Sequence, residues 1–206
     1  CGDAIAVGNF ALEPLDPGML APAGLVVGCP DADTRSVHVL QQSMWSVGLL
    51  SEGSLITEGE TETSDGFGQT LAVGDFNGDD IDDVVVGAPI SSRFCEVGNC
   101  GAVHVFQGPH MDGTSIDMAH ATITGSDRND RLGLGLATGD IDGDGLDDML
   151  FGSTNNDDGG DTAGKAYLVL ASSLGTNTTI NLSTADHSFV GDETINVAGV
   201  RPVGLG

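Results

Sequence analysis

A nine-residue acidic segment occurs twice in this chain and constrains the fold more than any other feature. The first copy runs from Asp75 to Asp83, and the second runs from Asp140 to Asp148, 65 residues further along. In both copies, side-chain oxygens stand at positions 1, 3, 5 and 9, and an apolar residue stands at position 7. This spacing lets the odd-numbered side chains and the carbonyl of position 7 converge on one hard cation. We therefore predict two cation-binding loops.

The acidic segments belong to a longer repeating unit. An apolar run with glycines precedes each segment, and a second apolar run, a turn and two more short runs follow it. Residues 1–66 repeat this order without the acidic segment, and residues 198–206 begin the order once more. Such regularity is typical of repeat architectures. We expect a single region with repeats at about 1–66, 67–131 and 132–197, followed by the start of a further repeat at 198–206.

Each unit is predicted to form four short β-strands. Its apolar runs span four to seven residues, are rich in Val, Ile, Leu and Thr, and are bounded by Gly, Asn, Asp and Pro. Equivalent glycines recur at intervals of 66, 65 and 67 residues, at Gly8, Gly74, Gly139 and Gly206. Four strands per unit at this period are typical of propeller blades, which are radially packed four-stranded sheets. The expected fold class is all-β, with about three blades of four antiparallel strands.

These motifs resemble the FG-GAP repeat, the blade of the N-terminal β-propeller of integrin alpha subunits. The family pattern is Phe-Gly, an acidic calcium loop and Gly-Ala-Pro. The middle unit has these elements at Phe67–Gly68, at 75–83 and at Gly87–Pro89. The third unit keeps the loop but has Leu132–Gly133 and Gly152–Thr154 at the flanking motifs. The resemblance implies a calcium ion in each acidic loop.

By this resemblance, four side chains and the carbonyl of position 7 bind each ion. Position 8, which is Asp82 or Asp147, is expected to point away from the ion. Position 6 tends to need a positive φ, which Asp80 tolerates better than most residues. The second loop has four carboxylates and Gly145 at position 6, so we predict that it binds calcium more tightly than the first. The implied ligands are Asp75, Asn77, Asp79, Ile81 (carbonyl) and Asp83 in one site, and Asp140, Asp142, Asp144, Leu146 (carbonyl) and Asp148 in the other.

The first unit lacks a comparable loop. Where the aspartates would begin, only Asn9, Glu13 and Asp16 carry side-chain oxygens, and three prolines interrupt the segment 9–22. We expect no calcium ion in that unit.

The charge of the chain excludes several partners. Acidic residues outnumber basic residues by 31 to 6, which gives a formal net charge of −25. This charge argues against nucleic acid and against anionic membrane surfaces as partners. No apolar run approaches the roughly 20 residues of a transmembrane helix, so no transmembrane segment is expected.

The four cysteines favour an oxidising compartment, and hence an extracellular or cell-surface location. Cys95 and Cys100 flank a short turn that a disulfide would close, and Cys1 and Cys29 remain as a second candidate pair. A lipid anchor on Cys1 is an alternative to that second disulfide.

The sequence gives no sign of a catalytic constellation. His38 and His104 occupy equivalent strand positions, each in Val-His-Val, and we interpret them as blade residues rather than catalysts. Neither a Gly-x-Ser-x-Gly elbow nor a Walker-type loop occurs. The chain is therefore predicted not to be an enzyme.

The leading functional hypothesis is a secreted or cell-surface, calcium-binding propeller module for adhesion, recognition or extracellular structural assembly. Its expected partners are a protein or glycan ligand or a second copy of itself. The alternative is a non-catalytic accessory propeller of a secreted hydrolase or lyase. Because closed propellers typically have four to eight blades, three explanations compete for about three blades: part of a longer chain, a ring formed by two chains, and an open repetitive assembly.

Overall fold

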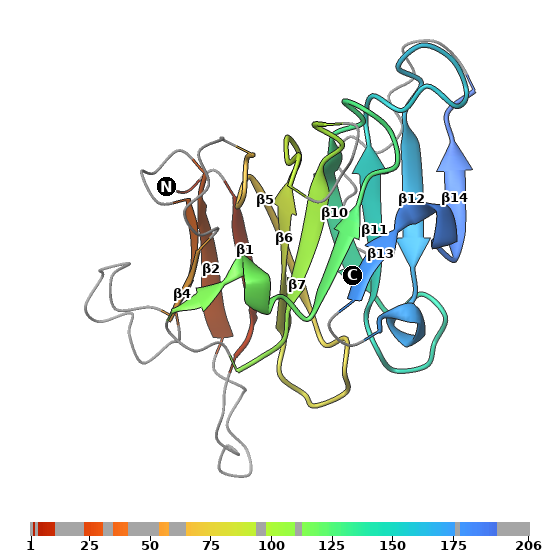
Figure 1. The fold of residues 1–206 in the computed structure, drawn as a ribbon. Helices are drawn as coiled ribbons and strands as arrows, with labels where there is room; N and C mark the ends of the chain where they lie inside the picture. The colour runs from red at the N-terminus through yellow and green to blue at the C-terminus, as the bar shows by residue number, and fades with distance from the viewer. Residues whose placement is uncertain are drawn as a thin grey trace.

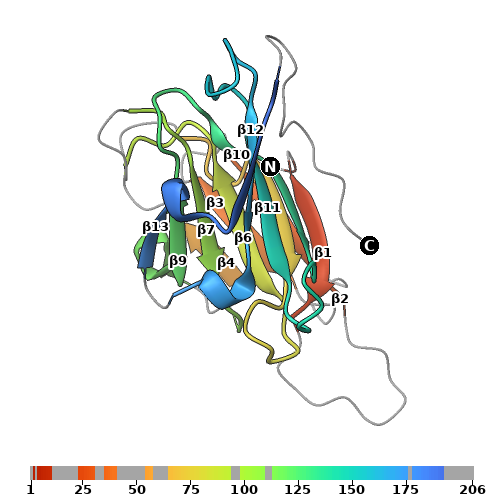
Figure 2. The ribbon, with the colours of Figure 1, turned by 90° about the vertical axis from the view of Figure 1, so that its right-hand side faces the viewer.

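The computed structural model describes residues 2, 4–10, 23–30, 35–40, 54–57, 65–93, 98–109, 113–175 and 178–192. Within these ranges the chain forms three β-sheets and no α-helix, and the sheets stand side by side in chain order (Figure 1). Figure 2 looks along this row, so that strands of successive sheets overlap in the view. The prediction of an all-β fold built from propeller-type blades is confirmed.

Each sheet contains four consecutive antiparallel strands. The first sheet contains β1 (Ile5–Asn9), β2 (Ala23–Cys29), β3 (Ser36–Leu40) and β4 (Ser54–Thr57). The second contains β5 (Thr70–Gly74), β6 (Asp83–Ala88), β7 (Ala102–Phe106) and β9 (Ala121–Thr124). The third contains β10 (Leu132–Gly139), β11 (Asp148–Ser153), β12 (Lys165–Val169) and β14 (His187–Val190).

A fifth, parallel strand crosses from each later sheet to the one before it. β8 (Thr114–Ser115) pairs with β4, and β13 (Thr178–Asn181) pairs with β9. Both belong to the connection between the third and fourth strands of the following blade. This connection therefore covers the outer edge of the preceding sheet, which protects an otherwise unpaired edge.

The middle sheet buries both faces, which explains its continuous apolar runs. In β6, Val84 and Val86 pack into a core shared with the first sheet, whereas Val85 packs into a core shared with the third. Adjacent side chains on a strand point to opposite faces, so a strand between two sheets must be apolar at every position. The segment Val84–Ala88 meets this requirement and is buried throughout.

The glycines of the repeat lie where adjacent blades approach most closely. Gly87 faces Gly133 of the next blade, and Gly28 faces Gly68 in the same way. A Cβ on Gly87 or Gly28 would overlap the carbonyl oxygen of the opposing glycine. The Thr70 hydroxyl donates a hydrogen bond to the Gly133 carbonyl, and the Thr138 hydroxyl donates to the Val73 carbonyl at 2.6 Å. Glycine is therefore required for these blades to meet backbone to backbone.

The buried histidine of the middle blade is a packing residue, as predicted for His104. Its ring lies 5.9 Å from that of Phe67, and its Nδ1 is 3.1 Å from the Thr122 hydroxyl. Burial, with a smaller contribution from the Arg93 charge, lowers the pKa of His104 to about 3. Tyr167 fills the equivalent place in the third blade and is also buried.

Two of the cysteines lie among the described residues. Cys29 and Cys100 are buried, and neither carries a free thiol. Their predicted partners, Cys1 and Cys95, lie outside the described residues, so both pairings stay predictions. Glu13, Asp16 and the predicted repeat start at 198–206 also lie outside them. The helices found in the described ranges are single 3-10 turns, none with the length or hydropathy to cross a bilayer.

Replacement of Gly87 by alanine should destabilise the fold by about 3 kcal/mol, the upper end of the range for overpacking, because backbone cannot rotate away from the new methyl group. Gly113→Ala is the control, since Gly113 has φ of 82° but open space around its Cα. That control should cost about 1 kcal/mol from backbone strain alone. Urea unfolding of both variants measures the difference, and equal losses would contradict the close-approach argument.

The stability of the protein should depend on pH through His104. Its pKa is about 3 in the fold against 6.5 when unperturbed, so the stability of the neutral, buried form is fully present above pH 6.5 and is lost as pH falls toward 3. Relative to His104→Phe, the wild-type chain should lose about 1 kcal/mol between pH 7.5 and pH 5.5. Urea midpoints at both pH values, in saturating calcium, measure this loss. A pH-independent difference between the two chains would refute the prediction.

Candidate metal centre

The two acidic loops connect the first and second strands of their blades. The loop at 75–82 follows β5, the loop at 140–147 follows β10, and both lie at the same end of the sheets (Figure 1). Each loop returns directly into a buried strand, β6 or β11, which begins with the aspartate of position 9. The strands therefore fix both ends of each loop.

The aspartate at position 1 organises its loop from within. In the first loop, the Asp75 carboxylate accepts hydrogen bonds from the backbone N–H groups of Gly78 at 2.7 Å and Asp80 at 2.8 Å. In the second loop, Asp140 accepts from Gly143 at 2.8 Å and Gly145 at 3.1 Å. The two loops thus wrap around their first carboxylate in the same way.

Positions 3 and 5 add a second set of equivalent bonds. In each case the side-chain oxygen accepts a hydrogen bond from the backbone N–H two residues further on, at 2.9–3.1 Å. The accepting side chains are Asn77 and Asp79 in the first loop and Asp142 and Asp144 in the second. These short-range bonds fix each side-chain oxygen against the backbone of its own loop.

Position 6 adopts the backbone conformation that the sequence predicts. Asp80 has φ of 64° and Gly145 has φ of 91°. For a residue with a side chain, such a φ is uncommon, and aspartate is among the residues that tolerate it. The first loop therefore carries some backbone strain that the second loop avoids.

The aspartate at position 9 is buried beneath each loop. Asp83 accepts the N–H of Gly108 at 2.8 Å, and Asp148 accepts the N–H groups of Ile141 and Ala171, both at 2.9 Å. Both residues have 0% exposure. Burial raises the pKa of Asp83 to about 7, although the N–H groups of Gly108 and Phe76 act in the opposite direction. A cation beside a buried carboxylate favours its charged form.

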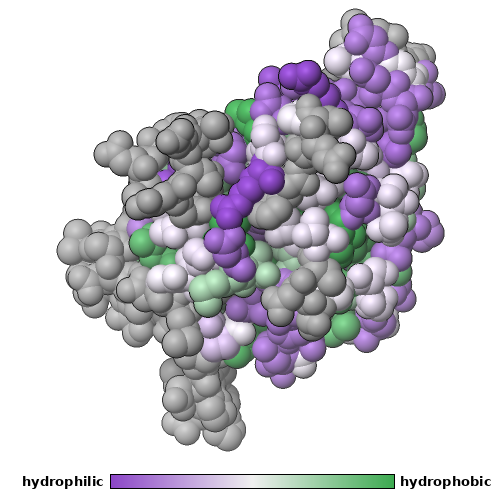
Figure 3. Space-filling view, in the orientation of Figure 1, coloured by the Kyte–Doolittle hydropathy of each residue, from purple (hydrophilic) through white to green (hydrophobic). Residues whose placement is uncertain are grey.

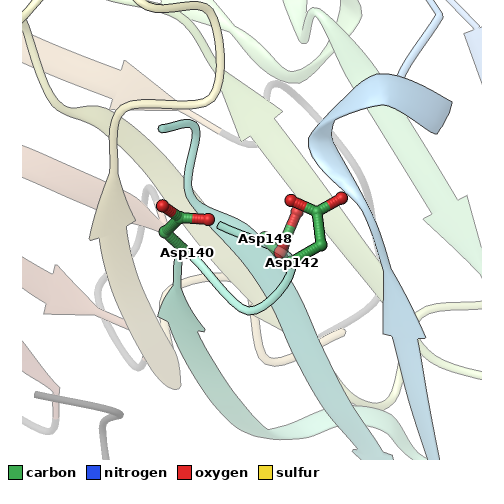
Figure 4. A group of neighbouring side chains, drawn as sticks. All are labelled: Asp140, Asp142 and Asp148. Carbon is green, nitrogen blue, oxygen red and sulfur yellow. The ribbon is translucent and has the colours of Figure 1, made fainter. Parts of the chain in front are cut away.

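Three carboxylates converge in the second loop. Oxygen atoms of Asp140, Asp142 and Asp148 all lie within 4.8 Å of one another (Figure 4). Ligand oxygens at 2.3–2.6 Å from one calcium ion can be at most about 5 Å apart, so this spacing fits a shared ion. Asp144 is outside the cluster. The equivalent positions of the first loop are Asp75, Asn77 and Asp83, so an amide takes the place of one of the three carboxylates there.

The aspartate at position 8 has a role that the sequence did not reveal. Asp147 accepts the N–H of Asp75 through its carboxylate, and its own N–H donates to the Asp75 carbonyl, both at 2.9 Å. Asp82 makes the same two bonds to Asn9, both at 2.7 Å. These side chains thus reach the preceding blade. A signal was present in the sequence, since both copies have aspartate at position 8.

Comparisons with known proteins agree with this architecture. The sequence profile of the FG-GAP repeat matches residues 67–106. Integrin alpha-7 of Mus musculus is 34% identical over 152 residues, which are 73% of this chain and 12% of that protein. Integrin alpha-5 of Xenopus laevis is 31% identical over 157 residues, which are 74% of this chain and 13% of that protein.

A second group of relatives consists of phospholipases rather than integrin subunits. Phosphatidylinositol-glycan-specific phospholipase D of Homo sapiens is 34% identical over 147 residues, which are 70% of this chain and 17% of that protein. This chain thus spans less than a fifth of the length of the relatives it matches. The match to the FG-GAP profile, the repeated loops and the blade topology agree, and the chain belongs to the FG-GAP repeat family of the integrin alpha-type β-propeller.

Proposed function

We propose that this chain is a calcium-binding β-propeller module of a secreted or cell-surface protein, which serves adhesion, recognition or extracellular structural assembly. The observation that carries the proposal is the convergence of Asp140, Asp142 and Asp148 on one point within a loop that the chain repeats. Only oxygen ligands are offered there, and calcium prefers six to eight oxygens in a flexible shell.

The ligands proposed are those implied by the repeat. In the second site, Asp144 and the Leu146 carbonyl would join the three clustered carboxylates, and in the first site Asp75, Asn77, Asp79, Asp83 and the Ile81 carbonyl would act alike. The additional carboxylate, Asp142 in place of Asn77, supports tighter binding at the second site. The uncommon φ of Asp80 supports the same order.

The ion would act as a structural clamp on each blade. It would join the loop to the buried start of β6 or β11, because position 9 belongs to both. It would also neutralise part of an acidic loop in a chain with a net charge of −25. Its binding free energy would therefore add to the stability of the fold.

The exposed surface supports a recognition or assembly role. The loop carboxylates accept hydrogen bonds from their own backbone, an arrangement suited to holding an ion. On the face seen in Figure 3, hydrophobic residues form small, separate patches among hydrophilic ones. Larger apolar side chains are exposed on the two outer sheets, at Ile5 and Val7 of β1 and at Phe189 and Val190 of β14. These positions suit contact with a further blade, a second copy or a protein ligand.

The second candidate function is an accessory propeller of a secreted hydrolase. The similarity to phosphatidylinositol-glycan-specific phospholipase D favours it. The two candidates differ in what accompanies this region in the full gene product. A catalytic domain there, whose hydrolysis survives deletion of residues 1–206, would favour the accessory role. Cell or ligand binding that is lost on the same deletion would favour adhesion.

Calorimetric titration of the wild-type chain with calcium should show two binding sites. Asp140→Ala should abolish the tighter site and Asp75→Ala the weaker one, because each removes the carboxylate around which its loop folds. At calcium concentrations about 100-fold above each dissociation constant, each site should add about 2.7 kcal/mol to the free energy of unfolding. Chelation should remove that gain.

Asp161→Ala is the matched control for this titration, since Asp161 is an exposed aspartate outside both loops. It should bind two calcium ions like the wild-type chain. Equal loss of affinity from the two loop variants would overturn the ranking of the sites. A wild-type chain that takes up no calcium would overturn the proposed function.

A further inference from the structure

We propose that Asp147 couples the two calcium loops, so that an ion bound at 140–148 increases the affinity of the loop at 75–83. Asp147 would act as a positioning residue for a site to which it contributes no ligand. The inference rests on the proposed function, because it concerns the regulation of those same sites.

The physical link is a pair of hydrogen bonds between adjacent blades. The Asp147 carboxylate accepts the N–H of Asp75 at 2.9 Å, and the Asp147 N–H donates to the Asp75 carbonyl at 2.9 Å. A single residue, Asp147, thus binds both the backbone N–H and the backbone carbonyl of Asp75. These two bonds fix the position and orientation of the Asp75 backbone. We refer to this two-bond contact as the blade latch.

Each end of the blade latch is part of a proposed calcium site. Asp147 lies between Leu146 and Asp148, the proposed ligands at positions 7 and 9. Asp75 is the proposed ligand at position 1, and its carboxylate holds the N–H groups of its own loop. An ion that orders residues 146–148 would therefore order Asp147, and through it the residue around which the first loop folds.

The chain repeats the latch where no second site is predicted. Asp82 makes the same two bonds to Asn9, each at 2.7 Å, and Asn9 also donates from its side chain to the Asp80 carbonyl at 2.8 Å. Asn9 holds the place of position 1 in the unit without an acidic loop. This repetition makes the latch a property of the blade, which links two ion sites only when both blades have one.

The repeated glycines leave the space that the latch needs. A Cβ on Gly74 would lie 2.7 Å from the Asp147 carboxylate, and a Cβ on Gly8 would lie 2.5 Å from that of Asp82. Both distances are too short for a side chain to be accommodated without displacement of the carboxylate. The glycine before position 1 of one blade thus leaves room for the aspartate at position 8 of the next blade, so the two residues together allow the blade latch to form.

The direction of coupling follows from the difference between the loops. The second loop gathers three carboxylates, whereas the first has Asn77 in place of one of them and an uncommon φ at Asp80. The second loop should therefore fill first. Once an ion orders the second loop, the first loop loses less conformational entropy when it binds its own ion. The result is positive cooperativity between the two sites.

Calorimetric calcium titrations of the whole chain test the coupling. In the wild-type chain, the first loop should bind at least about 5-fold more tightly than in Asp140→Ala, where the second site is disabled. Asp147→Ala should still bind two ions but should lose this enhancement. Asp147→Asn should retain most of it, because an amide oxygen still accepts the Asp75 N–H. Asp82→Ala is the matched control, and it should leave the enhancement in place.

Hydrogen exchange followed by NMR supplies a readout that needs no ion. In calcium-free buffer, Asp147→Ala should accelerate exchange of the Asp75 amide, and Asp82→Ala should accelerate that of Asn9 instead. Unchanged exchange at Asp75 would overturn the latch. Two sites that bind independently in the wild-type chain, or cooperativity that persists in Asp147→Ala, would overturn the coupling while leaving the calcium sites intact. Absence of any calcium uptake would instead remove the proposed function, and the coupling with it.

Discussion

The close approach of backbone to backbone between neighbouring blades is the constraint on which the rest of this structure depends. Sheets normally pack about 10 Å apart with side chains between them. Here, Gly87 and Gly133 remove those side chains at one point, and the Gly133 carbonyl occupies the space that a Cβ would need. The two motifs that flank the acidic loop are thus explained by one contact. The glycine of the second motif in one blade packs against the glycine of the first motif in the next blade. The residue before that second glycine, Phe67 or Leu132, packs into the core between the two blades.

This contact also sets the geometry of the loops. Because the blades meet at fixed glycines, the ends of β5 and β10 are held in register, and the loops that follow them come within hydrogen-bonding reach of each other. The bonds from Asp147 to Asp75 and from Asp82 to Asn9 are the result. A loop in this fold is therefore connected to its neighbour as well as to its own blade. Cation binding to such a loop would have consequences beyond the blade that holds it.

The sequence predicted the fold class and the strand order because both depend on local pattern. Runs such as Val84–Val86 are apolar at every position, and glycine, asparagine and aspartate mark their ends. The positive φ of Asp80 was equally predictable, since it follows from the position in the loop. The contacts between blades were not predictable in this way. The bonds of Asp82 and Asp147 join residues more than 70 positions apart in the chain, and the parallel pairing of β8 and β13 with preceding sheets depends on how blades face one another. The ligand roles of the loop residues and the cysteine pairings stay predictions.

The acidity of the chain is best understood together with this arrangement. Two divalent ions would offset only four of the 25 net negative charges, so the proposed ions would not serve chiefly to neutralise the protein as a whole. Their effect would be local, because Asp83 and Asp148 are carboxylates without exposure to solvent. The burial that raises the pKa of Asp83 to about 7 represents a cost of keeping that charge within the fold. A cation in the loop would offset this cost at the point where a blade, its loop and the neighbouring latch meet.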